Sequence, residues 1–318
     1  MGPLVVAYVV GLLGHGDDFS LVVDGGLGSL TQWVPVFVCW LAAYRTRFRR
    51  SYVVLAAAAV TMFATANQIY VGSLAGALSL PFPGPTDVGY LLFYPLILAS
   101  LAELVRPQLR KMTGSVVLDS AVASLGAAAV LIVLVTPVLA SGSGVPLSIA
   151  TFVAIAYPLL DLLLVAVVAG LVASQGLVLG RRWTLLMIGL LVFSAADIAY
   201  ALRVATDSYV IGTILDAGWA IGLTLIALWV AGASRPVDSH RLTGVRDRVV
   251  LVPAVGSMAA LGVLSLSSQV QVLLPAVVLA ALTLLVASLR FHFAGRSARA
   301  LLYRSPDGKV QEFLLLRD

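Results

Sequence analysis

Residues 183–202 read WTLLMIGLLVFSAADIAYAL and carry a single charge, Asp197. A helix of this length reaches about 30 Å, which is the thickness of the hydrocarbon core of a bilayer. A carboxylate in the middle of a membrane helix costs roughly 2.5–3.5 kcal/mol on insertion scales. The stretch therefore predicts a membrane helix in which Asp197 needs a partner, a proton or a function.

The whole chain has the same apolar character. Of its 318 residues, 60% are hydrophobic and 11% are charged, and the mean hydropathy is +1.03. Soluble domains carry about 25% charged residues. We therefore expect an all-α polytopic membrane helix bundle, with a membrane domain over 1–289 and a short cytoplasmic tail over 290–318.

Apolar runs of spanning length recur along the chain. The predicted spans are 27–44, 51–74, 88–105, 115–139, 150–173, 183–204, 212–232, 249–267 and 272–289. A tenth candidate, 2–13, reaches only about 18 Å as a helix, and whether it spans is left open. We expect nine or ten transmembrane helices.

The basic residues predict an orientation, because 19 of the 20 Lys and Arg fall in alternate connections between these runs. The basic segments are 45–50, 106–111, 180–182, 235–248 and the tail from Arg290. Basic connections stay in the cytoplasm, so we expect a multi-pass protein of the plasma membrane with a cytoplasmic C-terminus. The basic residues then determine the orientation in the membrane and contact lipid head groups. We expect no binding of nucleic acid.

Several kinds of site have no basis in this sequence. The only cysteine is Cys39, none of the three histidines lies deep in an apolar run, and both lysines fall in polar segments. A disulfide framework, a metal site, a haem site and a retinal Schiff base are therefore not expected. We expect no metal, no cofactor and no enzymatic activity.

Two segments share one pattern. FATANQIY (63–70) and FSAADIAY (193–200) each precede an Asp-x-Gly-aromatic motif, DVGY at 87–90 and DAGW at 216–219. A Tyr-Pro pair also recurs 63 residues apart, at Tyr94 and Tyr157, which is about half of the 130-residue offset of the longer pattern. These offsets predict internal two-helix hairpin repeats. The expected hairpins are 51–105, 115–173 and 183–232.

The polar residues of these helices are expected to converge in the outer half of the bilayer. Positions i, i+4 and i+7 share one helix face, and the predicted topology brings several such faces to similar depth. The candidate ligand-binding residues are Asn67, Tyr70, Asp87, Tyr94, Tyr157, Asp161, Asp197, Tyr200 and Asp216. Arg203, the one basic residue expected on the outer side, is a candidate ion-pair partner.

Structural roles are the alternative for these residues. Asp87 and Asp216 suit helix N-termini, where a carboxylate meets free N–H groups. Asp161 and Asp197 lie deeper and are the stronger candidates for a ligand or proton site, although hydrogen bonding between helices would also retain them.

Two ion pairs are expected near the cytoplasmic ends of the helices. Asp119 lies within reach of Arg110 and Lys111 along the chain, and Glu103 lies one turn from Arg106.

The sequence resembles a known family at LPFPGPTDVGYLLFYPLIL (80–98), AYPLLDLLL (156–164) and ADIAYALRVATDSYVIGTILDAGWAIG (196–222). It is similar to the N-terminal multi-helix membrane region of bacterial GGDEF/EAL proteins, which make or degrade cyclic di-GMP, over about residues 30–290. The resemblance implies a sensory or anchoring module that passes a signal to a cytoplasmic domain. Residues 290–318 contain neither a GGDEF nor an EAL motif, so no catalytic activity is implied, and Asn67 stands where an acidic residue is expected.

Together these patterns predict an integral membrane sensory module with a polar pocket in the outer half of the bilayer. Its expected partners are the lipid bilayer, a small polar or amphipathic ligand from the outer side, and a cytoplasmic signalling partner or a second copy of the chain. The alternative is a proton-coupled small-molecule transporter, because hairpin repeats and buried carboxylates also occur there.

Overall fold

The computed structural model describes most of the chain. The described residues are 1–14, 19–76, 78, 80–109, 114–141, 149–175, 181–205, 208–210, 212–233, 251–269 and 272–303. Within them every regular element is a helix, and no strand occurs. The all-α prediction is confirmed for this part of the chain.

Ten α-helices and one short π-helical turn, η1, make up these elements. In chain order they are α1 (Gly2–Gly14), η1 (Leu21–Leu27), α2 (Gly28–Arg45), α3 (Ser51–Ala75), α4 (Pro85–Leu109), α5 (Gly114–Ser141), α6 (Ile149–Gln175), α7 (Arg181–Ala205), α8 (Asp216–Ala233), α9 (Leu251–Ser267) and α10 (Leu274–Tyr303). Each of the ten apolar runs in the sequence forms a helix. The last helix is longer than expected, because α10 continues from the apolar run into the segment predicted as a tail.

Six helical segments of the described chain are long and apolar enough to cross a membrane, which indicates a membrane-embedded protein. They are Leu21–Arg45, Ser51–Ala75, Pro85–Arg106, Val117–Leu134, Trp183–Val204 and Leu274–His292. Four further apolar helical segments are shorter: Gly2–Gly14, Ala156–Leu171, Asp216–Gly232 and Ala254–Ser267. The expected total of nine or ten spans stays a prediction for these shorter segments.

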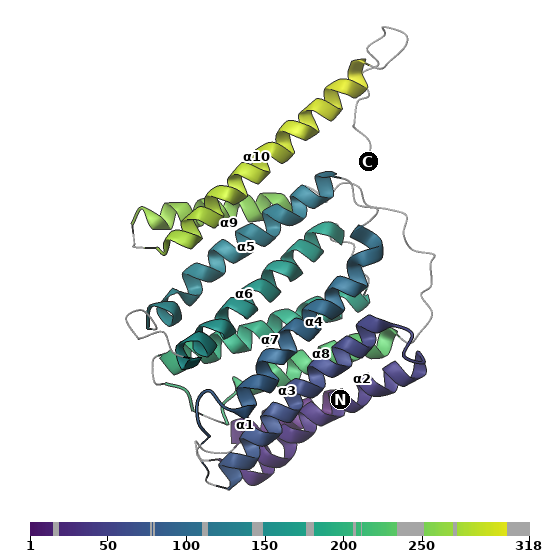
Figure 1. Ribbon diagram of the computed structural model, residues 1–318, viewed down its shortest axis with the longest axis vertical. Helices are drawn as coiled ribbons and strands as arrows, with labels where there is room; N and C mark the ends of the chain where they lie inside the picture. Colours follow the sequence, from purple (N-terminus) through teal and green to yellow (C-terminus); the bar gives the residue numbers. More distant parts are fainter. Residues whose placement is uncertain are drawn as a thin grey trace.

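The helices lie side by side, with their ends in two groups (Figure 1). Helix α3 packs against α4, α5 against α6, and α7 against α8, so each predicted hairpin is a packed pair of neighbours in the chain. Helix α2 contacts both α3 and α8, whereas α9 and α10 pack on α5 at one edge. In Figure 1, α10 projects beyond the rest of the bundle.

Two of the hairpins close through the same contact. A Cβ added at Gly89 of α4 would meet the Cβ of Ala66 at 2.8 Å, and one added at Gly218 of α8 would meet the Cβ of Ala196 at 2.7 Å. Ala66 and Ala196 directly precede the polar residues of the repeated pattern. Glycine is therefore required in both Asp-x-Gly-aromatic motifs, because it lets the second helix of each hairpin approach the first. Common descent of the hairpins stays a prediction.

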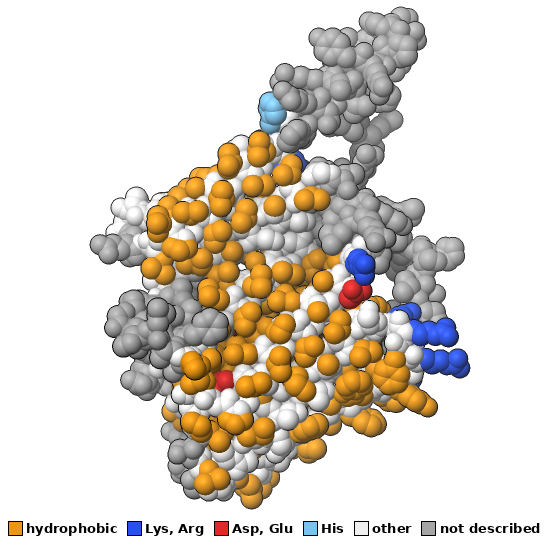
Figure 2. All heavy atoms as spheres, in the orientation of Figure 1, with side chains coloured by type: hydrophobic (Ala, Val, Ile, Leu, Met, Phe, Trp, Pro, Cys, Tyr) orange, Lys and Arg blue, Asp and Glu red, His pale blue; other side chains and the backbone are white. Residues whose placement is uncertain are grey.

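The surface is apolar over a wide area. Hydrophobic side chains cover most of the described face in Figure 2, and Lys and Arg side chains gather at the edge where α2 ends and α3 begins. Exposed large hydrophobic residues are distributed over nearly all of the helices. Such a surface suits contact with lipid.

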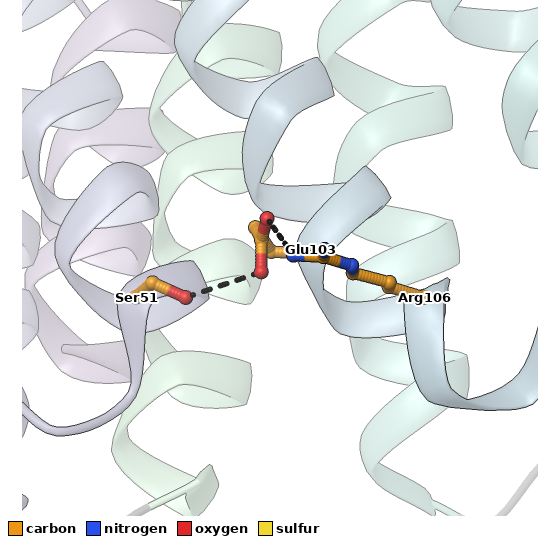
Figure 3. A network of polar contacts seen from close by, with 3 residues as sticks. All are labelled: Ser51, Glu103 and Arg106. Atoms are coloured by element: carbon orange, nitrogen blue, oxygen red, sulfur yellow. Dashed lines mark hydrogen bonds and ion pairs between the residues drawn. The ribbon is translucent and has the colours of Figure 1, made fainter.

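One expected ion pair is present at the end of α4. Arg106 Nη1 lies 3.4 Å from Glu103 Oε1, and the Ser51 hydroxyl lies 3.5 Å from Glu103 Oε2 (Figure 3). Both charged side chains are largely exposed, so this pair contributes little to stability.

Asp119 has a different partner from the one expected. It is buried and pairs with Arg290 of α10, with Nε 2.7 Å from Oδ1. The predicted partners Arg110 and Lys111 lie outside the described residues. The prediction rested on closeness along the chain. The packing of α10 on α5 instead brings Arg290 to Asp119 from a distant part of the sequence.

Candidate functional site

The hydroxyl of Tyr94 connects two carboxyl groups in the interior of the bundle. It lies 2.9 Å from Oδ1 of Asp161 and 2.7 Å from Oδ2 of Asp197. Tyr94 and Asp161 are each only 1% exposed. The three residues come from α4, α6 and α7, so the structure brings together three predicted site residues that are far apart in the chain.

An indole completes this group. Trp219 of α8 donates from Nε1 to Oδ1 of Asp197 at 2.6 Å. Both oxygens of Asp197 thus have a hydrogen-bond partner. We call Tyr94, Asp161, Asp197 and Trp219 the core cluster.

The core cluster lies toward one end of the bundle. Counted from the nearer helix ends, Tyr94 is nine residues into α4, Asp161 is twelve into α6, and Asp197 is eight from the end of α7. At 1.5 Å per residue these depths are about 12–18 Å. The nearer end is the one opposite to the basic connections, in agreement with the predicted convergence.

Asp87 lies beside the core cluster and has two partners of its own. Its Oδ2 accepts from the backbone N–H of Gly84 at 2.8 Å, and its Oδ1 accepts from the Tyr157 hydroxyl at 2.8 Å. The first contact satisfies a free N–H just before α4 begins. The expected capping role is therefore present, and Tyr157 links the start of α4 to α6.

Asp216 has the same two kinds of partner at the start of α8. Its Oδ2 accepts from the backbone N–H of Gly212 at 2.7 Å, and its Oδ1 accepts from the Tyr209 hydroxyl at 3.0 Å. Burial and the charge of Asp216 raise the pKa of Tyr209 above its ordinary value. Tyr209 therefore keeps its proton and remains a donor at neutral pH.

Asn67 and Asp197 occupy corresponding positions and make corresponding contacts. Tyr90 of the first Asp-x-Gly-aromatic motif donates to Oδ1 of Asn67 at 3.3 Å, as Trp219 of the second donates to Asp197. The shorter distance belongs to the carboxylate, as expected for an ionised acceptor. The first hairpin thus makes the same contact with the neutral amide of Asn67 in place of the carboxyl group of Asp197.

Tyr70 and Tyr200 lie at the rim of the polar group. The Tyr200 ring contacts the rings of Tyr209 and Trp219, with centroids 4.7 Å and 5.7 Å apart, and it is 37% exposed. Tyr70 is partly buried and lies near Tyr200 and Asp216. All nine candidate residues are therefore in one region, in which hydrogen bonds join Tyr94 to Asp161 and Asp197, and separately join Tyr157 to Asp87.

An aromatic layer packs beside the core cluster. Phe93 stacks on Phe193 with centroids 4.4 Å apart, and Phe63 lies 5.0 Å from Phe193. Phe193 is one turn before Asp197 on α7, and Phe93 directly precedes Tyr94. The three rings are almost completely buried, so they form an apolar layer next to Tyr94 and Asp197.

The expected ion-pair role of Arg203 stays a prediction. Its side chain is exposed and it follows Asp197 by six residues on α7. No group of three His, Cys, Asp or Glu side chains in the described ranges is placed to hold a metal ion.

Sequence reasoning missed three members of this region. Trp219 was recognised as part of the repeated motif but was not among the candidate ligand-binding residues, Tyr209 lies in a connection, and Ser194 was not singled out. Ser194 is completely buried and faces the Asp161 carboxyl group. The signal that could have identified it is its place one turn from Asp197 on the same helix.

No family model, curated protein or solved structure matches this chain.

Proposed function

We propose that this protein is an integral membrane sensory module whose ligand site is the core cluster and its surroundings. The observation that carries the proposal is the Tyr94 hydroxyl between Asp161 and Asp197 inside an apolar bundle. Burial of a carboxyl group in a membrane costs free energy, and such residues mark functional sites in membrane proteins. Four helices meet at this group, so a ligand that changes its hydrogen bonds would shift helices against one another.

The proposed ligand is a small polar or amphipathic molecule, or an ion, that arrives from the outer side. The basic connections support a cytoplasmic location for the opposite ends of the helices and for the C-terminus. The resemblance to the membrane region of GGDEF/EAL proteins adds support for signalling. In this proposal the signal leaves through the helices toward a cytoplasmic partner or a second copy of the chain in the plasma membrane.

The aromatic layer favours a sensor over a transporter. The side chains of Phe63, Phe93 and Phe193 are at most 6% exposed, and their rings pack against one another beside the carboxyl groups. A sensor needs only an opening on one side, with a packed core that transmits the change.

A thermal-shift experiment on the purified full-length protein tests the proposal. A panel of small polar and amphipathic solutes is screened for compounds that raise the melting temperature, since a ligand at 100 times its Kd stabilises by about 2.7 kcal/mol. We expect a stabilising compound whose effect is lost in Asp161→Asn and in Asp197→Asn. Glu103→Gln, at the exposed pair, is the matched control and should respond as the wild type does.

Two outcomes contradict the proposal. A stabilisation that persists in both Asn variants would place the ligand elsewhere. A panel without any stabilising compound, together with loss of folding in both variants, would indicate that the core cluster only holds the helices together.

A proton-coupled transporter is the second candidate, because a carboxyl pair bridged by a hydroxyl is a suitable carrier of protons. Its test is proton movement into liposomes that contain the purified protein and a pH-sensitive dye. Solute-dependent acidification that is lost in Asp161→Asn would favour the transporter.

A further inference from the structure

The two hydrogen bonds of Tyr94 set a condition on the protons of the core cluster. A tyrosine hydroxyl carries one proton and can donate only one hydrogen bond, whereas an ionised carboxylate can only accept. The Tyr94 oxygen lies at hydrogen-bond distance from both Asp161 and Asp197. Both contacts are hydrogen bonds only if one of the two carboxyl groups is protonated and donates to Tyr94.

The contacts of Asp197 indicate which carboxyl group that is. Its Oδ1 faces Trp219 Nε1 at 2.6 Å, and its Oδ2 faces the Tyr94 hydroxyl at 2.7 Å. An indole N–H can only donate, and short distances are typical of ionised acceptors. Asp197 therefore suits the carboxylate form, Tyr94 donates to it, and the longer contact of 2.9 Å leaves Asp161 as the donor to Tyr94.

Ser194 supplies an independent observation at the same place. Its hydroxyl is 0% exposed and, in the part of the chain that the structure describes, makes no hydrogen bond of ordinary length. It faces the Asp161 carboxyl group. A buried hydroxyl that lacks a hydrogen bond of ordinary length is unfavourable, and this one lies beside the Asp161 carboxyl group, where it adds a second polar neighbour to Tyr94.

The groups around Asp161 and Asp197 favour a pair in which one carboxyl group is neutral. The titratable and charged side chains nearest to the pair are Tyr70 on α3, Asp87 and Tyr90 on α4, Tyr157 on α6, Tyr200 and Arg203 on α7, and Asp216 on α8. Helix α5 also packs against α6 and α7, and its one ionisable residue, Asp119, is paired with Arg290. Asp87 and Asp216 are further carboxyl groups of this region, and each accepts hydrogen bonds from donors of its own. Two ionised carboxylates joined through one hydroxyl would repel each other strongly.

We propose that Asp161, Tyr94 and Asp197 form a one-proton binding site, in which Asp161 is the carboxylic acid and Asp197 is the carboxylate. The inference deepens the proposed function, on which its role in signalling rests, by naming the proton as the ligand. The Asp161 hydroxyl donates to Tyr94, which donates to Asp197, which also accepts from Trp219. Release of the Asp161 proton to water at the nearer end of the bundle leaves two carboxylates and one donor between them, so α6 and α7 are pushed apart.

Infrared spectroscopy of the purified full-length protein tests this assignment, with the proton as the probe. A protonated carboxyl group has a C=O stretching band above the amide band, and the band moves in heavy water. We expect the band in the wild type at neutral pH, and its loss when the pH is raised far enough to remove the proton. Asp161→Asn keeps a donor toward Tyr94 and should remove the band, whereas Glu103→Gln should retain it.

Tyr94→Phe provides a second variant that keeps both acids. Removal of the bridging hydroxyl should retain the band and move its frequency, because the carboxylic acid loses its acceptor. An unchanged frequency in this variant, or an unchanged band in Asp161→Asn, would overturn the assignment. So would a wild-type spectrum without the band over the whole pH range.

A sodium titration at fixed pH separates the proton from a metal ion. Removal of the band by sodium but not by choline would show that the site prefers a metal cation, which would also overturn the proposal. The spectra need no signalling readout, so they are independent of the sensory function. The expected band together with a failed solute screen leaves the proton site intact and removes the small-molecule sensor, and the reverse combination removes only the proton site.

Discussion

Arg290 and Asp119 join α10 to α5 by an ion pair between residues 171 positions apart, with Nε 2.7 Å from Oδ1 and Nη2 3.4 Å from Oδ2. The Asp119 side chain is 2% exposed and the Arg290 side chain is 12% exposed. This pair therefore joins α10 to α5 by a buried electrostatic contact in addition to their apolar packing.

Removal of either partner should destabilise the protein strongly. Asp119→Leu leaves an unpaired guanidinium, and we expect a loss of about 3–5 kcal/mol in the free energy of unfolding, measured by denaturant titration in detergent. The double variant Asp119→Leu/Arg290→Met should recover most of this loss, because no unpaired buried charge remains. As a control, Glu103→Ala at the exposed pair should cost only about 0.2–1 kcal/mol. Equal effects at the two pairs would show that Asp119 and Arg290 are not held as the structure has them.

The glycines of the two Asp-x-Gly-aromatic motifs should not tolerate alanine. Gly89→Ala and Gly218→Ala would each press a methyl group against an alanine of the preceding helix, and we expect a loss of about 1–3 kcal/mol. Gly72→Ala on α3 is the control, since its Cβ would meet nothing within 4 Å, and it should be neutral or stabilising by about 0.5–1 kcal/mol. Melting temperatures of the three variants check the order, and a Gly89→Ala variant as stable as Gly72→Ala would argue against the close approach of α3 and α4.

The indole N–H of Trp219 should contribute more than that of Trp33. Trp219→Phe retains an aromatic ring but removes the donor to Asp197, and hydrogen bonds to charged groups contribute about 1.5–3 kcal/mol. Trp33 donates to Gln68 at 3.1 Å at an exposed position, so Trp33→Phe should cost about 0.5–1.5 kcal/mol. The free energy of unfolding of both variants is the measurement. The reverse order would contradict an ionised Asp197.

Cysteine labelling should confirm the predicted orientation. Cys39 is 0% exposed and should react with a maleimide only after denaturation. In a Cys39→Ala background, a membrane-impermeant maleimide should label Leu78→Cys in intact cells and Arg49→Cys only after permeabilisation. Both positions are exposed, in the connections on either side of α3. Labelling of Arg49→Cys in intact cells would show that the orientation is opposite to the predicted one.

The helices could be predicted from the sequence almost in full. Apolar runs of spanning length separated by polar connections leave the backbone no other way to satisfy its hydrogen bonds in a membrane. The α3 and α7 runs were expected at 51–74 and 183–204 and occur at Ser51–Ala75 and Arg181–Ala205. The end of α10 was missed, because the polar residues after Arg290 do not interrupt the helix.

Most members of the polar region could also be predicted, apart from Trp219, Tyr209 and Ser194, but the pairing within it could not. Helical spacing placed Asp197 and its neighbours on one face, and the alternation of basic connections placed Asp161 and Tyr94 at similar depth. Spacing does not reveal that one hydroxyl serves two carboxyl groups 67 and 103 positions away along the chain.

The sequence by itself determined the apolar helices, their order and the end of the bundle at which the polar residues gather. Only the tertiary structure decided that Asp119 meets Arg290 and that Trp219 meets Asp197. The physical reason lies in the rotation and approach of each helix. These depend on small close contacts such as Gly89 against Ala66, whereas the hydropathy that keeps a helix in a membrane is nearly the same for many apolar side chains.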